Sequence, residues 1–231
     1  MHFTIHDTPG VIHFVRLLSW LVLKLSGWQV INVAPATGSY LIIAAPHTSN
    51  WDFPLGIAMA FHLRLRVYFI GKHTLFEGPT GPIMRWLGGI PLNREASKNF
   101  VDASIAAFDN NENLIFAIAP EGTRTSVARW KTGFYHMAKG ANVPLALAYF
   151  DFATRTGGIG KMLKTTENMA DDMQVIADFY RPIIAKNPYN YNPDITGTQT
   201  LTEPTAAPIA ELSKPQTLGE CPPVQPAKTT V

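Results

Sequence analysis

Residues 40–52, YLIIAAPHTSNWD, decide the expected fold because they join two kinds of secondary structure within one short stretch. Residues 40–45 form an apolar run with aromatic and β-branched side chains, which is typical of a buried strand. Residues 48–50 favour turns and helix caps. From Asp52 the apolar residues follow a helical spacing as far as His62. The stretch therefore predicts a strand, a turn and a helix in succession.

The same alternation continues along the chain. Further strands are expected over residues 65–70, 113–119 and 144–150, and a short strand is expected just before Arg94. Further helices are expected over residues 82–87, 97–110 and 132–139. Near-continuous apolar strands that are separated by helices are typically buried on both faces. The sequence thus predicts an α/β fold with a mixed, largely parallel central sheet and helices on both faces.

The composition indicates a large apolar interior or an apolar partner. Of 231 residues, 46% are hydrophobic and only 16% are charged, and the formal net charge is +2. This balance excludes a chain that binds nucleic acid over its whole length. The single cysteine, Cys221, excludes an internal disulfide framework and a cysteine-based zinc site. Residues 1–186 hold 17 Lys and Arg against 13 Asp and Glu, and this mildly basic body favours anionic lipids or phosphorylated substrates.

Three regions follow from the change in character along the chain. Residues 1–35 form an apolar N-terminal region, residues 36–186 form the main domain, and residues 187–231 form a tail rich in Pro, Thr and Ala. The tail cannot bury enough apolar surface to offset its ordering entropy, so we expect it to be disordered or loosely attached.

The N-terminal region admits two readings. Residues 11–33 are strongly apolar, but their longest uninterrupted run is too short to span a bilayer, and they lack the flanks of a signal peptide. The region is either a helix packed in the core or an amphipathic helix that associates with a membrane. In the second case its tryptophans would lie at headgroup level, and Arg16 and Lys24 would reach lipid phosphates.

His47 and Asp52 follow the first expected strand and are the first candidates for chemistry. On one helix, side chains five residues apart would point about 140° apart, so a turn between them is needed to bring them together. Asp52 would then bind one ring nitrogen, and the other nitrogen could take a proton from a hydroxyl. His2 and Asp7 share this spacing, so the spacing alone also fits a loop histidine with a capping aspartate.

Two further motifs follow expected strands. PEGTR at residues 120–124 places a guanidinium beside backbone N–H groups and a hydroxyl, a combination that suits phosphate. GGIPLNR at residues 88–94 ends a strand in Arg94. Ligands in open α/β sheets gather at such strand ends. Taken singly, each motif also fits a tight turn or a surface arginine.

Together these motifs resemble the 1-acylglycerol-3-phosphate acyltransferase family, the glycerolipid acyltransferases, over about residues 11–185. The family's four blocks are matched by HTSNWD at residues 47–52, GGIPLNR at 88–94, PEGTR at 120–124 and VPLAL at 143–147. Gly71-Lys72 and Lys131-Thr132-Gly133 match two further family patterns. Ala119 stands where the family commonly has an aromatic residue, and Asn93 stands where it often has Asp.

The resemblance implies transfer of an acyl group from acyl-CoA or acyl-carrier protein to a lysolipid hydroxyl in phospholipid biosynthesis. It implies no cofactor and no metal, and a location at the cytoplasmic face of a membrane. His47 would be the general base and Asp52 would orient it, while Lys72 or backbone N–H groups would stabilise the oxyanion. The acceptor phosphate would be held by Arg94, Glu121, Gly122, Thr123 and Arg124.

Other functions stay open at this point. The acceptor could be another lysolipid, because the arginines favour a phosphate without specifying its headgroup. A lipid-binding membrane protein without catalysis is a different class, against which the retained pair His47 and Asp52 argues. A metal-dependent phosphoesterase would use the same two residues as ligands, but no further His or Asp spacing around them supports it.

Overall fold

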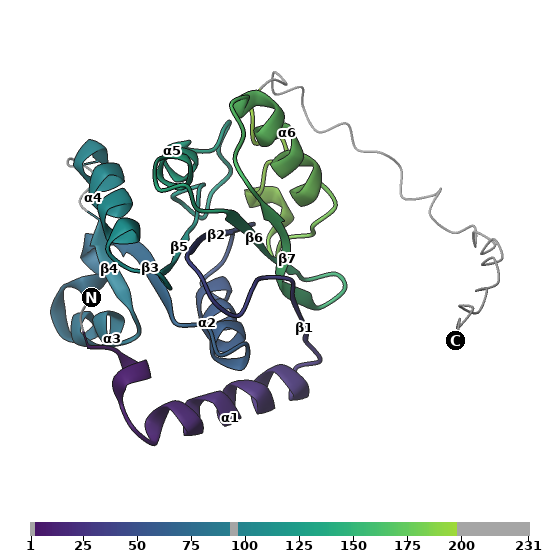
Figure 1. Ribbon diagram of the computed structural model, residues 1–231. Helices are drawn as coiled ribbons and strands as arrows, with labels where there is room; N and C mark the ends of the chain where they lie inside the picture. Colours follow the sequence, from purple (N-terminus) through teal and green to yellow (C-terminus); the bar gives the residue numbers. More distant parts are fainter. Residues whose placement is uncertain (1–2, 93–96, 198–231) are drawn as a thin grey trace, which may run out of the picture. The chain divides into compact units, whose positions relative to one another are not determined.

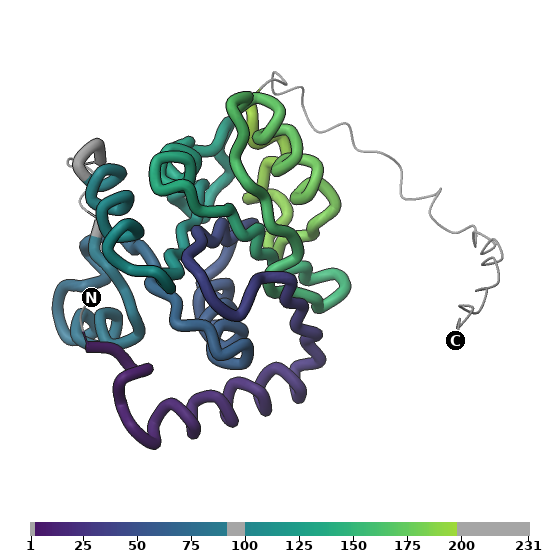
Figure 2. Tube along the Cα trace, viewed as in Figure 1, coloured from purple at the N-terminus to yellow at the C-terminus, as the bar shows by residue number. Residues whose placement is uncertain are grey.

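The computed structural model describes residues 3–92 and 97–197 (Figure 1) (Figure 2). Its strands are β1 (Gln29–Asn32), β2 (Tyr40–Ala44), β3 (Val67–Lys72), β4 (Gly89–Leu92), β5 (Ile115–Ile118), β6 (Leu145–Asp151) and β7 (Thr156–Leu163). Within these residues they form one seven-stranded sheet in the order β1-β7-β6-β2-β5-β3-β4. All neighbouring strands are parallel except β6 and β7, which are antiparallel. The expected mixed, largely parallel sheet is confirmed.

Six α-helices lie in the described residues, together with short 3₁₀ turns. The helices are α1 (Val11–Leu25), α2 (Asp52–His62), α3 (Gly81–Trp86), α4 (Ser97–Asp109), α5 (Gly133–Gly140) and α6 (Met169–Tyr180). The turns are η1 (Ile5–Asp7), η2 (His73–Phe76), η3 (Gly78–Thr80) and η5 (Pro188–Asn190). In this part of the chain, no helix combines the length and the apolar character that crossing a membrane would need.

Helices cover both faces of the sheet, and β2 shows why. Successive side chains of a strand point to opposite faces. Leu41 and Ile43 pack into a core shared with α4, α5 and α6, whereas Tyr40 and Ile42 belong to a second core. On that second face α2 lies between the sheet and α1, whose Leu23 packs with the α2 residue Met59 (Figure 1).

The apolar N-terminal span contains a helix and a strand. Helix α1 ends in a Schellman motif, in which the Trp28 N–H donates to the Leu23 carbonyl at 2.9 Å and the Gly27 N–H donates to the Lys24 carbonyl at 3.2 Å. Gly27 takes the left-handed conformation that this cap requires, with φ of 73°. The chain then continues into β1, which pairs with β7. The sequence analysis had anticipated neither of these two strands.

Residues 187–197, which the sequence analysis assigned to the tail, pack onto the main domain. Ile195 is only 1% exposed and belongs to the same core as Trp130. The Trp130 N–H donates to the Ile195 carbonyl at 3.0 Å. This apolar contact, together with its backbone hydrogen bond, holds a segment that composition alone marks as loose. Residues 198–231 lie outside the described residues, so their expected disorder stays a prediction.

Candidate active site

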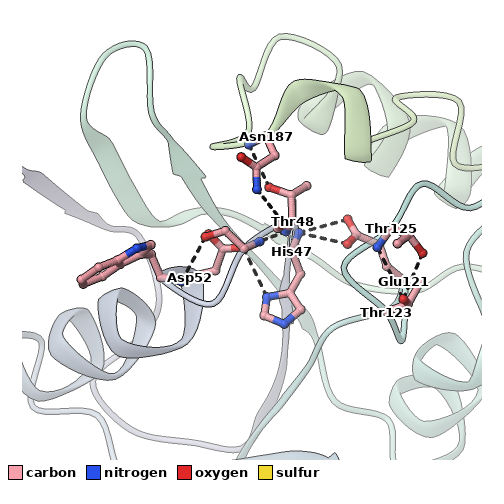
Figure 3. A network of polar contacts seen from close by, with 9 residues as sticks. His47, Thr48, Asp52, Glu121, Thr123, Thr125 and Asn187 are labelled. Carbon is pink, nitrogen blue, oxygen red and sulfur yellow. Dashed lines mark hydrogen bonds and ion pairs between the residues drawn. The ribbon is translucent and has the colours of Figure 1, made fainter.

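The loop between β2 and α2 carries His47 and is folded back on itself by Asp52. Asp52 is the first residue of α2, and its side chain is almost fully buried. Its Oδ2 accepts hydrogen bonds from the backbone N–H groups of Thr48 and Ser49, both at 2.7 Å, and its Oδ1 accepts one from the Ser49 hydroxyl at 3.1 Å (Figure 3). The turn that the sequence analysis required is therefore made by the aspartate itself.

This turn brings His47 and Asp52 together, as the sequence predicts. The His47 Nδ1 lies 3.5 Å from Asp52 Oδ2 (Figure 3). That separation is longer than an ordinary hydrogen bond, and contacts of this kind often tighten only when substrate is bound. The His47 Nε2 makes no hydrogen bond to any described residue. It is therefore available to a substrate hydroxyl.

The surroundings of His47 favour its neutral form. Burial lowers the pKa of the imidazole below its ordinary value of 6.5, Asp52 opposes this effect, and the positive charge of Arg124 adds to it. These effects favour the uncharged imidazole, which is the form that can accept a proton.

Glu121 lies behind His47 rather than among exposed phosphate-binding groups. Its side chain is buried, and its two carboxylate oxygens accept from the His47 backbone N–H at 3.0 and 3.2 Å (Figure 3). The pKa of Glu121 is raised to about 8, chiefly by burial, with the hydrogen bond from the His47 N–H opposing the rise and the charge of Asp52 adding to it. These contacts support a positioning role, which differs from the phosphate binding that the resemblance implies.

The last three residues of the PEGTR loop, Gly122, Thr123 and Arg124, lie nearer to solvent than Glu121. Gly122 has a φ of 67°, which favours glycine, and a side chain there would meet the Lys131 ammonium at 3.3 Å. The Thr123 Oγ1 accepts from the Thr125 N–H at 3.4 Å within the same turn. Arg124 and Lys131 are both exposed. Two cations thus accompany the loop that follows β5.

Of Lys72 and Arg94, the structure describes only Lys72, and it does not bring that side chain into polar contact with the other described residues of the expected site. Lys72 ends β3, so it lies at the same carboxyl edge of the sheet as the end of β2, but β5 separates the two strands. It is exposed, and its ammonium makes no hydrogen bond or ion pair within residues 3–92 and 97–197. Arg94 lies outside the described residues, so its role stays a prediction.

An apolar cavity of about 180 Å³ lies between α2 and the sheet. His47 and Asp52 line it together with residues along one side of α2, including Phe53, Gly56 and Ala60. Since Asp52 begins α2, the pair lies at one end of the cavity. A space lined mostly by carbon with a base at its end is suited to an alkyl chain whose reactive group lies at His47.

Asn187 is a site residue that the sequence analysis missed. Its Nδ2 donates to the Thr48 carbonyl at 2.9 Å, and its backbone N–H donates to the Thr48 hydroxyl at 3.2 Å (Figure 3). The neighbouring Lys186 places its ammonium 5.0 Å from the ring centre of Trp51. No local sequence signal could have identified Asn187, because its partner lies 139 residues away in the chain.

The possible metal ligands and the family of the chain both bear on the chemistry of this site. Among the residues that the structure describes, no group of three His, Cys, Asp or Glu side chains is placed to hold a metal ion. The family model described as acyltransferase matches residues 29–148, which include His47, Asp52 and the PEGTR loop but not Asn187. No curated protein matches the chain.

Proposed function

The chain belongs to the acyltransferase family, and from this premise we propose that it transfers a fatty acyl group from acyl-CoA or acyl-carrier protein to the hydroxyl of a lysophosphatidic-acid-like acceptor. The reaction would serve phospholipid biosynthesis. The observation that carries the proposal is the pair His47 and Asp52, 3.5 Å apart at one end of an apolar cavity.

The proposed reaction needs one base and no covalent enzyme intermediate. The His47 Nε2 takes the proton of the acceptor hydroxyl while that oxygen attacks the thioester carbon. Asp52 holds the ring and stabilises the imidazolium that forms. When the tetrahedral intermediate collapses, the carbon–sulfur bond breaks and the imidazolium returns its proton to the leaving thiolate. Lys72 or backbone N–H groups would stabilise the intermediate's oxyanion.

Cations near the site support a phosphorylated acceptor. Arg124 lies close enough to His47 to lower its pKa, and Lys131 lies against Gly122. A guanidinium and an ammonium together suit a phosphate that must be held beside the base. The expected Arg94 would add to them. The same cations would bind the phosphate of other lysolipids. Comparing the turnover of different acceptors would therefore identify the preferred headgroup.

The exposed side of α1 supports action at a membrane surface. Ile12, Ser19 and Leu23 are buried, but most apolar residues of the helix are not. The exposed ones are Phe14, Leu17, Leu18, Trp20, Leu21, Val22 and Leu25. Contiguous apolar surface of this kind typically marks a site of interaction with a protein or a membrane. We place it on the cytoplasmic face of the bilayer, as a peripheral or monotopic contact.

The proposed activity is tested by release of free thiol from acyl-CoA in the presence of lysophosphatidate. His47→Ala is expected to lower the turnover rate by about 100- to 10,000-fold, the usual contribution of a general base. His136→Ala is the matched control, because His136 is an exposed histidine on α5. Undiminished turnover in His47→Ala would contradict the mechanism. The same assay with acyl-carrier protein and other lysolipids identifies donor and acceptor.

A further inference from the structure

A second cavity lies at the far end of α2 from the pair His47 and Asp52. It has a volume of about 390 Å³ and is lined by His13, Arg16, Leu17, Trp20, His62 and Arg64. None of these residues lines the apolar cavity of the active site. At 1.5 Å per residue, the ten residues from Asp52 to His62 separate the two sites by about 15 Å.

The polar side chains of this cavity are nitrogen-bearing groups without acceptors. Neither Arg16 nor Arg64, nor either of the two histidines, makes a side-chain hydrogen bond or ion pair with any residue of the described chain. The Nε of Arg16 is also buried. A buried guanidinium N–H without an acceptor is unfavourable, so such a group normally has a partner. A bound anion would supply the hydrogen-bond acceptor that the Arg16 Nε–H lacks.

In the part of the chain that the structure describes, no carboxylate pairs with these cations. Helix α1 contains no acidic residue. Asp7, in the turn before it, is already bound by Arg66 at 2.6 Å and by the Thr4 N–H at 2.9 Å. The pKa of the adjacent His6 is lowered to about 4, chiefly by burial and then by the charges of Arg66 and Arg16, with Asp7 opposing them. The charges around the cavity are therefore predominantly positive.

We propose that this cavity binds a phosphate group through Arg16 and Arg64. Guanidinium groups recognise phosphate with two parallel hydrogen bonds. At about 30 Å³ for each molecule of liquid water, the volume corresponds to about 13 water molecules, which is sufficient for a phosphate. Leu17 and Trp20 form an apolar wall that continues into the exposed side of α1, so the phosphate of a lipid headgroup fits the cavity as well as free phosphate.

The test measures binding of inorganic phosphate to the full chain by titration calorimetry, with no acyl donor present. All proteins carry Arg124→Ala, which removes the proposed acceptor-phosphate contact of the active site. Arg16→Gln and Arg64→Asn are each expected to weaken binding by about tenfold or more, the effect of losing a hydrogen bond to a charged group. Asn is chosen at position 64 because Arg64 has a φ of 60°, which Asn tolerates.

Lys24→Gln is the matched control. Lys24 lies on α1, contacts the Trp20 ring at 4.8 Å and is not part of the cavity lining. It is expected to leave binding near the level of the Arg124→Ala parent. Equal weakening by Lys24→Gln, or no phosphate binding in the parent, would overturn the proposal. Arg64 is exposed, so Arg64→Asn still decides the matter if Arg16→Gln does not fold.

A second arm distinguishes the two sources of phosphate. Maltoside micelles carrying phosphatidic acid, or the same mole fraction of oleate, compete with inorganic phosphate. Competition by phosphatidic acid alone assigns the site to a lipid headgroup, and phosphate binding without such competition assigns it to free phosphate. Competition by oleate as strong as that by phosphatidic acid would overturn recognition of phosphate. Because no assay step involves acyl transfer, this proposal can fail or stand independently of the proposed function.

Discussion

At His47, two neighbours act on the proton affinity in opposite directions. Asp52 raises the pKa of the imidazole and Arg124 lowers it, while burial is the largest effect and also lowers it. A general base works only when it is deprotonated, so kcat/KM should fall as the pH drops through the His47 pKa, which is below 6.5. The enzyme should therefore keep its activity into mildly acidic solution.

Arg124→Ala should move the acid limb of the pH profile, where kcat/KM falls as the pH drops, to higher pH. Removing the positive charge makes the imidazolium easier to form, so the His47 pKa rises and protonation begins to inhibit at a higher pH. The profile of kcat/KM against pH measures the shift, and Arg129→Ala, another exposed arginine nearby in the chain, is the control. An unshifted acid limb would show that the Arg124 charge does not reach His47.

At the scale of elements, the candidate active site would depend on the segment after α6, which lies beyond the matched family region. Asn187 holds Thr48, the neighbour of His47, by two hydrogen bonds. Asn187→Ala removes the side-chain bond at 2.9 Å, so the catalytic loop should lose part of its positioning. Misplacement of a catalytic group by about 1 Å can lower rates about 100-fold, so we expect kcat to fall up to this far with little change in KM.

Asn192→Ala is the control for that variant. Asn192 belongs to the same segment and its Nδ2 donates to a backbone carbonyl, that of Val127, at 3.1 Å. A merely structural role of the segment predicts that both variants lose stability alike and leave kcat unchanged. A positioning role predicts a low kcat in Asn187→Ala alone, which Asn187→Gln should rescue in part.

Some elements were predictable and others were not, for local reasons. Helix α2 spans the expected residues because its start follows the turn at residues 48–50 and its apolar spacing is regular. Strand β7 contains Gly157, Gly158 and Gly160, and glycine disfavours strands. Its glycines instead let the neighbouring strand approach closely, since a side chain at Gly158 would clash with the Ile31 carbonyl of β1. Pairing with β1 and β6 makes this segment a strand.

At the scale of the whole molecule, the exposed side of α1 would set the orientation of the domain on a lipid surface. Leu25 is among its most exposed residues, at 78%. Burying a leucine side chain in an apolar phase contributes about 1.5–3 kcal/mol, so Leu25→Asp should weaken binding to anionic vesicles by more than about tenfold. Binding is measured by sedimentation of the protein with the vesicles. Tyr189→Asp, at a fully exposed aromatic residue of η5, is the control. Equal binding by all three proteins would contradict membrane contact through α1.

The sequence by itself determined the α/β class, the strand, turn and helix around His47, and the motifs on which the family resemblance rests. These features are local, because they depend on apolar periodicity and on short runs of specific residues. Only the tertiary structure decided that Glu121 holds the His47 amide, that Asn187 holds Thr48, and that Arg16 and Arg64 share one cavity. Each of these contacts joins residues that are far apart in the chain, and no local pattern encodes which distant groups the packed sheet and helices bring together.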